Sequence, residues 1–532
     1  MARIFLFCCV CLAFFASCQP ENPSGKKCLT LNIGSDPQTL DPRKARDLHT
    51  STLARMLFEG LTRVSKQGSV ELALAEKVDV SDDCKRFVFH LRNSFWSNGD
   101  PVRAQDFAAS WKSALDPAFA TDLAFQLYLI QGAEQAKKGE IGLDEVGIFT
   151  PDSHTLVVEL VHPTPYFLQL LNMPIFFPLH PTALQNINWS SQPETYIGNG
   201  PFSLSSWKHS DMISVQKNFR YWEAGSVELD QMNLVMLNSD TEIRMFEEKK
   251  LDWAGSPLGS LPVDAVAHLK ETDQLKISPF SGTYFFRVNT SDTWHGQKNP
   301  LSHPKLRQAL ALSIDRSAIV EHILQGGHLE AFTLVPPGMG LQTRIVQEAS
   351  QAKQLCQEAF KEYGLDLNEP LIISFAGTER NVTIAQAIQK QWQEKLGITI
   401  VLEAVEPKIY FQRVSQKDFQ LAAGSWIADF YDPINFLEVF KHKQGSTNNT
   451  GWEDGKYIDL LNRSALCKKS EERKLLLGEA EKILMEQMPM IPVFHYVMNF
   501  LQNEALRDVA LSPIGQIDFR WARFEPGSSS LR

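Results

Sequence analysis

The sequence predicts a mixed α/β fold, and a group of neighbouring segments in its second half is the main reason. Residues 371–375 form an apolar run typical of a strand, and 382–396 carry apolar side chains at helical spacing. Gly397 follows, and glycine commonly ends helices. Residues 398–405 and 419–426 have the character of two further strands. Strands and helices that alternate in this way favour a sheet covered by helices.

The first half of the chain adds further elements of both kinds. Residues 28–34 indicate a strand, and 48–61 have the apolar spacing of a helix. In 86–91, Phe87, Phe89 and Leu91 alternate with Arg86, Val88 and His90, which predicts a strand with one buried face. Residues 104–115 indicate a helix that Pro117 ends.

Some aromatic residues and glycines in the chain favour a structural role over a binding role. We expect Trp96, Trp111 and Trp222 to be core aromatic residues. Gly198 and Gly200 are expected to shape a turn, because two glycines this close together are weak evidence for a phosphate site.

A single carboxylate stands out at the end of the last of these strands. Asp429 follows the strand 419–426 and lies among Trp426, Phe430 and Tyr431. In open α/β sheets, ligands bind beyond the carboxyl ends of the strands. Asp429 would therefore suit a ligand that carries a cation and a flat or apolar group. The alternative is that it forms a turn or caps a helix beginning near Ile434.

The amino terminus has the pattern of an export signal. Arg3 precedes an apolar stretch at 4–15, which is too short to span a membrane, and residues 1–17 are predicted to be removed. The segment ends at Cys18, in a context that resembles a bacterial lipobox, so we expect Cys18 to be lipidated. The polar residues 18–27 would then form a tether.

Composition narrows the class of protein. The length of 532 residues allows two or three domains, and a net charge of −10 argues against a nucleic-acid partner. After the signal, the cysteines are Cys28, Cys84, Cys356 and Cys467, and neither they nor the dispersed histidines form a metal-binding pattern. We therefore expect no metal and no cofactor, and the sequence leaves the disulfide state open.

Several motifs together resemble the extracytoplasmic solute-binding proteins of peptide and nickel ABC importers, and their oligopeptide-binding branch in particular. The segment 74–111 has the family pattern LAE…SDD…FHLR…WSNG…PV…DF. The resemblance continues in the same order through IGNGPF at 197–202, NFRYW at 218–222, TYFFRVN at 283–289, PKLRQALALSIDR at 304–316, WIADFYDP at 426–433 and PMIPVFHY at 489–496.

The resemblance implies a periplasmic-binding-protein type II-like fold with three lobes and a ligand cleft between lobes I and III, which are joined by a hinge. Matched by motif, lobe I would comprise 28–70, 190–280 and 500–532. Lobe II would be 71–189 and lobe III 281–499.

The resemblance also implies a ligand site. In the oligopeptide branch, the aspartate of the WxADY motif binds the ligand's α-ammonium group, and this position is Asp429. We expect the rest of the site to include Ser425, Trp426, Ala428, Tyr284 and Leu48.

The chain departs from the family at one site position. Where the family has an arginine that meets the peptide carboxylate, this chain has Ala423. Either another cation takes this role, with Lys408, Arg413 and Arg287 as the candidates, or the preferred ligand lacks a simple carboxyl terminus.

The expected function is that of a lipid-anchored, monomeric receptor in the periplasm or at the cell surface. It would bind short peptides and deliver them to an ABC permease. A murein peptide, a nickel chelate, haem or an oligosaccharide are alternative ligands for the same fold. An exported hydrolase is a more distant alternative, and the sequence contains no GxSxG or HExxH motif that would support an enzyme.

Overall fold

The computed structural model describes residues 27–186, 188–341, 343, 349–364, 369–467 and 469–525. The predicted export signal, the tether up to residue 26 and Cys18 lie outside these residues. Among the described residues, no helix combines the length and the apolar composition needed to cross a membrane.

One large mixed sheet runs through the molecule. Its strands follow the order β17-β16-β18-β12-β19-β11-β1-β10-β9-β8, and β15 pairs with β19 beside this path. The strands are β1 Cys28–Asn32, β8 Phe202–Lys208, β9 Met212–Lys217, β10 Gln231–Val235, β11 Trp253–Gly255, β12 Lys276–Val288, β15 Leu329–Glu330, β16 Leu371–Ala376, β17 Ile400–Val405, β18 Leu421–Ile427 and β19 Met490–Gln502. Strands β16, β17 and β18 are parallel, as are β1, β10 and β11, which confirms the α/β class.

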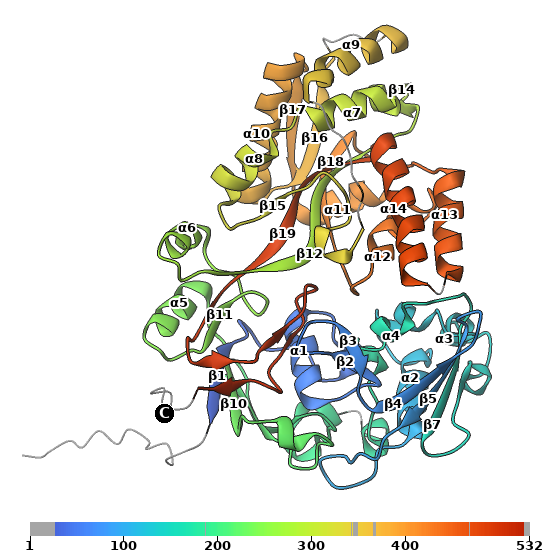
Figure 1. The fold of residues 1–532 in the computed structure, drawn as a ribbon, viewed down its shortest axis with the longest axis vertical. Coiled ribbons are helices and arrows are strands. Elements are labelled where there is room, and N and C mark those ends of the chain that lie inside the picture. The colour runs from blue at the N-terminus through green and yellow to red at the C-terminus, as the bar shows by residue number, and fades with distance from the viewer. Residues whose placement is uncertain are drawn as a thin grey trace, which may run out of the picture.

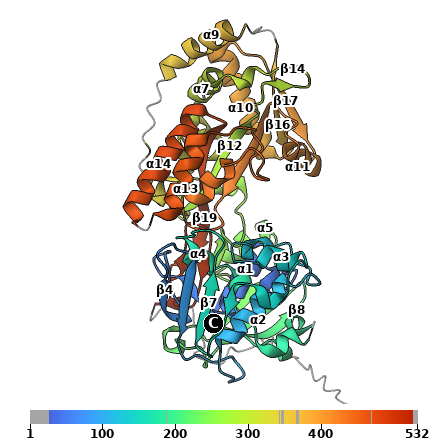
Figure 2. The same cartoon turned by 90° about the vertical axis from the view of Figure 1, so that its right-hand side faces the viewer.

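Two large hydrophobic cores divide the molecule. The first gathers buried residues from 29–258 and 498–522, and the second gathers residues from 284–494 together with Ile514. We call the parts built on these cores the first body and the second body. They occupy the lower and upper halves of Figure 1, and the view in Figure 2 separates them in the same way.

The long antiparallel strands β12 and β19 link the two bodies (Figure 1). Lys276 pairs with Phe500 at one end, and Arg287 pairs with Met490 at the other. Register shifts lie between Pro279 and Thr283 and between Tyr284 and Phe285. Because a bulge disrupts the ladder locally and bends the strand, this pair of strands is suited to act as a hinge.

The first body contains a second, smaller sheet. Its strands are β4 Ala75–Val80, β5 Arg86–Leu91, β7 Thr155–Glu159 and β6 Ile148–Phe149, in that order. The alternation predicted for β5 is confirmed, because Phe87, Phe89 and Leu91 are buried. The first body's helices are α1 Leu48–Leu57, α2 Ala104–Leu115, α3 Ala133–Lys137 and α4 Phe167–Leu170, and α5 Ser239–Glu247 and α6 Val263–Glu271 lie beside it.

The second body carries the helices that follow the link. These are α7 Pro304–Leu312, α8 Arg316–Ala318, α9 Ala352–Tyr363, α10 Glu379–Leu396, α11 Pro407–Ser415, α12 Ile434–Leu437, α13 Gly455–Leu466 and α14 Ser470–Gln487. Helix α10 is the one predicted at 382–396, and it ends at Gly397 with φ of 73°, a left-handed conformation that glycine adopts readily. Its buried face includes Ile388 and Trp392 as expected.

The predicted helix at 48–61 is four residues too long. α1 ends at Leu57, and Phe58 is extended. The side chain of Asn199 then takes the place of a further helical turn, because its Oδ1 accepts a hydrogen bond from the backbone nitrogen of Glu59 (3.0 Å) and its Nδ2 donates to the carbonyl of Glu59 (3.0 Å). The glycines that flank Asn199 allow this approach: a Cβ on Gly198 would lie 2.1 Å from the carbonyl oxygen of Leu57.

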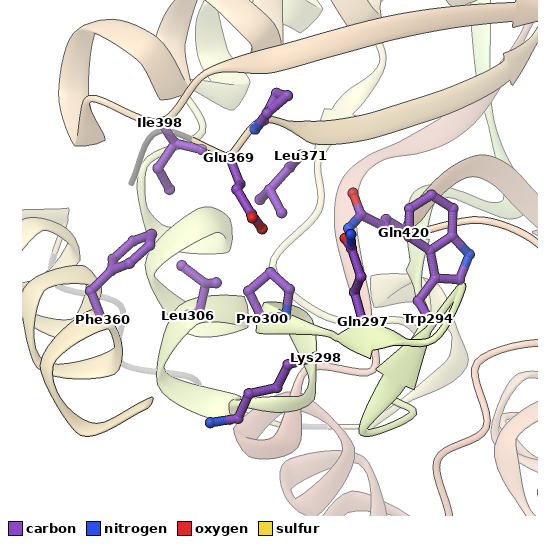
Figure 3. A pocket seen from close by; sticks show the side chains of 11 residues that line it. Trp294, Gln297, Lys298, Pro300, Leu306, Phe360, Glu369, Leu371, Ile398 and Gln420 are labelled. Atoms are coloured by element: carbon purple, nitrogen blue, oxygen red, sulfur yellow. The ribbon is translucent and has the colours of Figure 1, made fainter. Parts of the chain in front are cut away.

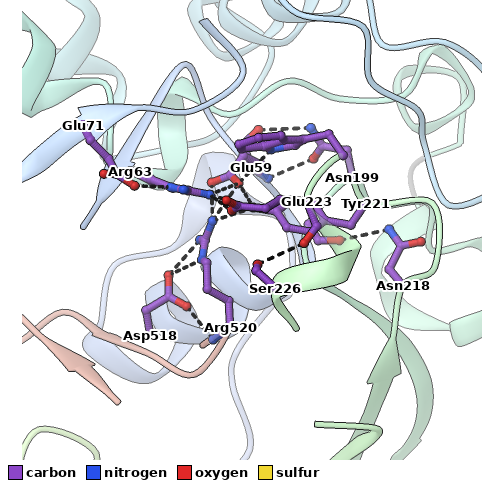
Figure 4. Close-up of polar contacts among 12 residues, drawn as sticks. Glu59, Arg63, Glu71, Asn199, Asn218, Tyr221, Glu223, Ser226, Asp518 and Arg520 are labelled. Atoms are coloured by element: carbon purple, nitrogen blue, oxygen red, sulfur yellow. Dashed lines mark hydrogen bonds and ion pairs between the residues drawn. The ribbon is translucent and has the colours of Figure 1, made fainter. Parts of the chain in front are cut away.

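A buried network of charged side chains holds the first body together (Figure 4). Arg520 donates to both carboxylate oxygens of Glu59 (2.8 and 2.6 Å), to Asp518 (2.8 Å) and to the hydroxyl of Tyr221 (2.9 Å). Arg63 continues the network to Glu223 (2.6 Å). Burial alone would lower the pKa of Arg520, but Asp518 and Glu59 outweigh it and raise that pKa well above its ordinary value. The network joins segments that are more than 450 residues apart in the chain.

Candidate functional site

The loop that carries Asp429 lies where the two bodies meet. It begins as β18 ends at Ile427, and the backbone nitrogen of Ala428 donates to the carbonyl of Ser281 in β12 (2.8 Å). On the other side of Asp429, the ring of Phe430 stacks on Tyr166 of the first body, with centroids 5.0 Å apart and planes within 5°. Asp429 lies between these two contacts; the residue as a whole is exposed to solvent, although the protein around its carboxylate removes part of that group's hydration.

Two further side chains fix this loop. Asn435 accepts hydrogen bonds at its Oδ1 from the indole of Trp426 (2.8 Å) and from the backbone nitrogen of Asp429 (3.3 Å). Asp432 forms a two-point ion pair with Arg473 of α14 (2.7 and 2.8 Å). Because paired arginine–carboxylate contacts fix orientation as well as distance, the loop is held in one arrangement.

Helix α12 has Pro433 as its N-cap residue, and no side-chain hydrogen bond caps it, so Asp429 is not its cap. The Oδ1 of Asp432 accepts from the backbone nitrogen of Ile434 (3.0 Å). The alternative interpretation of Asp429 as a cap for this helix is therefore wrong, and its carboxylate is left to other partners.

The environment of Asp429 is that of an anion without a counter-ion. Among the described residues, no Lys, Arg or His side chain lies within ion-pair distance of it. Loss of hydration raises the pKa of Asp429 above its ordinary value of 3.8, and a hydrogen bond with Asn435 offsets only part of this effect. A partly dehydrated carboxylate without a counter-ion is stabilised when a ligand brings a cation to it.

The edge of β18 beside this carboxylate is only partly covered. Strand β16 pairs with β18 at Leu421 and Ala422, whereas β18 continues to Ile427. On its other edge β18 pairs with β12 as far as Ile427. At Ser425 and Trp426, therefore, β18 has no pairing with β16 along one edge. Both residues are half-buried.

The remaining predicted site residues occupy different surroundings. Tyr284 is buried, stacks on Phe494 and donates through its hydroxyl to Oδ1 of Asn381 (3.2 Å). Ala428 is also buried. Leu48 is exposed at the first turn of α1 in the first body.

The residues considered as replacements for the family's arginine differ in their partners. Ala423 itself is buried in the second core. Arg413 is engaged by Glu403 (2.8 Å) and Asp418 (3.3 Å). Lys408 is exposed on α11, and Arg287 is half-buried on β12.

Sequence reasoning missed several residues that shape this site. Tyr166, Asn435 and Arg473 were not predicted to have any role. Tyr166 and Arg473 lie far from Asp429 in the chain, and no local pattern marks either of them. Asn435 follows the WIADFYDP motif by two residues, and its position after an Asp-Pro pair is the one signal that could have pointed to it.

A small cavity in the second body lies at the end of the strands opposite to Asp429 (Figure 3). It measures about 40 Å³ and is lined in part by Leu371, Gln420, Trp294 and Phe360. Leu371 begins β16 and Gln420 precedes β18, so the cavity lies at the amino ends of these strands. This volume is far below that of a ligand pocket and is too small for a peptide.

The described residues contain no group of three or more His, Cys, Asp or Glu side chains arranged to hold a metal ion. Cys356 is buried in the second core, and burial raises the pKa of its thiol to about 11, so it is a packing residue.

The molecule has two bodies linked by a pair of long strands, and the carboxylate of the exposed residue Asp429 lies between them, beyond the carboxyl end of β18. This arrangement is that of a two-bodied binding protein of the periplasmic type II class. Residues 69–448 match the family model of bacterial extracellular solute-binding proteins, family 5. The chain belongs to this family.

Relatives of known name match nearly the whole chain. The oligopeptide-binding protein OppA of Bacillus subtilis (strain 168) is 37% identical over 518 residues, which cover 95% of this chain and 94% of OppA. The unliganded open form of MppA, a periplasmic murein tripeptide binding protein, has a TM-score of 0.83 at 26% identity and covers 94% of this chain and 97% of its own. Listeria monocytogenes OppA bound to peptide has a TM-score of 0.70, also at 26% identity, and covers 94% and 99%.

The two structural neighbours differ in similarity although they are equally related in sequence. The higher TM-score belongs to the open, unliganded relative and the lower one to a peptide-bound relative.

Proposed function

We propose that the protein is a receptor that captures short peptides between its two bodies and delivers them to the permease of an ABC importer. The observation that carries this proposal is the Asp429 carboxylate, which has no cationic partner among the described residues and lies on a braced loop between the bodies. The names of OppA relatives that bind oligopeptides support the choice of ligand.

A peptide offers groups that suit each part of this site. Its α-ammonium group is charged at neutral pH, with an ordinary pKa of about 7.7–8.0, and would pair with Asp429. Its backbone would add to the open edge of β18 at Ser425 and Trp426, as an extended strand joins a sheet. Backbone hydrogen bonds do not depend on side chains, so the receptor would accept peptides of different sequence.

The proposed site also includes three residues that would support or cover the ligand: Ala428, Tyr284 and Leu48. Ala428 anchors the loop through its backbone contact with Ser281. Tyr284 would support the site from beneath, because it is buried and pairs with Ser425 across the β12–β18 ladder. Leu48 would approach the ligand from the first body when the two bodies close.

The division into lobes is part of the proposal. Lobe I would comprise 28–70, 190–280 and 500–532, lobe II 71–189, and lobe III 281–499. The second core supports most of lobe III, since it gathers residues 284–494 together with Ile514, whereas Met498 belongs to the first core. The first core extends through both other lobes, which would therefore move together as one body.

A murein-derived peptide is the second candidate ligand. The observation that favours it is Ala423, which removes the arginine that family members use for an ordinary peptide carboxylate. Nickel chelates, haem and oligosaccharides are less well suited, because each lacks the amine that the Asp429 carboxylate favours. The receptor would act without catalysis, as a monomer.

The affinity for peptides is expected to depend on pH. Asp429 must be ionised to bind an ammonium group, and its pKa in the free protein is raised above 3.8. Affinity should therefore be highest at neutral pH and should fall as the pH drops through this raised pKa. It should also fall above about pH 8 as the peptide amine loses its proton.

Calorimetric titration of a tripeptide from about pH 4 to pH 9 measures this dependence. Circular dichroism at each pH shows that the protein remains folded. The Asp429→Asn variant should lose the acid limb. An affinity that stays constant across this range in the native protein would contradict an ammonium–carboxylate contact.

Lipid anchoring at Cys18 is the second part of the proposal that can be tested alone. Mass spectrometry of the protein isolated from membranes should find Cys18 as the first residue, carrying acyl chains. The Cys18→Ser variant should appear in the soluble fraction. A mature protein that begins elsewhere and lacks lipid would refute the anchor and leave the peptide site unaffected.

A further inference from the structure

Arg287 is a cation on β12 in the second body, and its side chain lies against the neighbouring strand β18. It pairs with Ala422 across the β12–β18 ladder, and Phe285 pairs with Gly424 one step further along the same face. The guanidinium carbon lies 5.1 Å from the centre of the Phe285 ring. The guanidinium extends over Gly424, where an added Cβ would lie 1.6 Å from its Nη1. The absence of a side chain at residue 424 makes room for this arrangement.

No carboxylate compensates this cation. Among the described residues, none lies within ion-pair distance of Arg287. The same face of the sheet does carry Glu403, but its carboxylate is bound by Arg413 (2.8 Å) and by the hydroxyl of Ser374 (2.7 Å). Burial lowers the pKa of Arg287, and the nearby hydroxyl of Tyr410 opposes this effect only in part.

A contact with an aromatic ring does not balance the loss of hydration. A cation–π contact stabilises a cation less than the loss of water around a buried ion destabilises it. Arg287 is half-buried and keeps part of its surface open to solvent. An anion that arrives with the ligand would therefore be stabilised here.

The surroundings of Arg287 also suit a ligand. Helix α11 exposes Ile409 and Phe411, on either side of Tyr410, whose hydroxyl donates to the carbonyl of Ala423. Gly424 and Asp429 are five residues apart, so their Cα atoms are separated by at most about 17 Å. An extended peptide of about three to five residues spans a distance of this order.

We propose that Arg287 binds a carboxylate of the ligand, at the opposite end of the site from Asp429. It would thus take the role that Ala423 cannot perform, and the distance between the two charged residues would set the preferred peptide length. This inference rests on the proposed function. The carboxylate is either the peptide's carboxyl terminus or an acidic side chain near it, because both present the same group.

Calorimetry with four peptides of one sequence tests this proposal and separates the two sources of the carboxylate. The peptides have a free or amidated carboxyl terminus, and each form has either Glu or Gln near that terminus. In the native protein, neutralising the carboxylate that Arg287 binds should weaken binding about tenfold or more. Amidation has this effect if the terminus is bound, and the Glu-to-Gln change has it if the side chain is bound.

Two variants link this effect to Arg287. Arg287→Gln should weaken binding of the charged peptide by a similar factor and should make the neutralised peptide bind no worse than before. Gly424→Ala keeps the charge but displaces the guanidinium, and should have the same effect. Lys408→Gln removes an exposed cation on the neighbouring α11 and should bind all four peptides as the native protein does.

The proposal is overturned if neither amidation nor the Glu-to-Gln change affects binding to the native protein, a comparison that needs no variant to fold. It is also overturned if Arg287→Gln retains the native preference for the charged peptide. Neither result would affect the role of Asp429, because that role concerns the amino terminus. Absence of binding by all four peptides would instead refute the proposed function together with this inference.

Discussion

Replacing Asp429 with asparagine is expected to weaken the binding of a short peptide by about 2–4 kcal/mol, which is on the order of 100-fold in affinity. The substitution keeps the size of the side chain and removes its charge. The ligand's ammonium group would then be enclosed between the bodies without an anion, and this lost compensation is the source of the effect. Calorimetric titration with a tripeptide measures the change.

The Asp459→Asn variant is a matched control for this experiment. Asp459 is an exposed aspartate on α13 and pairs with Arg463 on the same helix. Its substitution should leave affinity unchanged. If Asp429→Asn binds peptides as tightly as Asp459→Asn does, Asp429 is not the ammonium site.

Removing Arg520 is expected to have the largest effect on stability. The Arg520→Ala variant removes the cation that contacts the buried carboxylates of Glu59 and Asp518 at 2.6 and 2.7 Å, and leaves Glu59 only its longer pair with Arg63 (3.7 Å). Breaking a buried pair in this way costs about 3–5 kcal/mol in the free energy of unfolding. Urea denaturation, followed by tryptophan fluorescence, measures this loss.

A surface ion pair provides the comparison. Arg46 pairs with Asp122, and both side chains are largely exposed. Exposed pairs contribute about 1 kcal/mol or less, so Arg46→Ala should change the free energy of unfolding little. Equal losses from the two variants would show that the network in Figure 4 does not stabilise the first body.

Local elements of the fold could be predicted from the sequence because their signals are local. The helix predicted at 104–115 has the bounds of α2, and the end of α10 at Gly397 follows from a single residue. The error at α1 has a different origin. The chain leaves the helix after Leu57 because Asn199, which lies 140 residues further along, holds Glu59 by its backbone. No pattern within 48–61 contains that information.

The candidate site shows the same division. Asp429 was found because it lies in a motif at the end of a strand, where α/β sheets place their ligands. Its support by Arg473 through Asp432 and the stacking of Tyr166 on Phe430 depend on how distant segments pack. The guanidinium of Arg287 lies over Gly424 because Arg287 pairs with Ala422 and because Gly424 has no side chain. Sequence alone could name Arg287 as a candidate, and only the structure separates it from Arg413.

We propose that a peptide is held by its charged amino terminus when the two bodies close. The most direct test is calorimetry of the native protein with two forms of one tripeptide, the first with a free amino terminus and the second N-acetylated. Acetylation is expected to weaken binding by about 2 kcal/mol or more, because it removes the charge that Asp429 pairs with. Equal affinity for the two forms would contradict it.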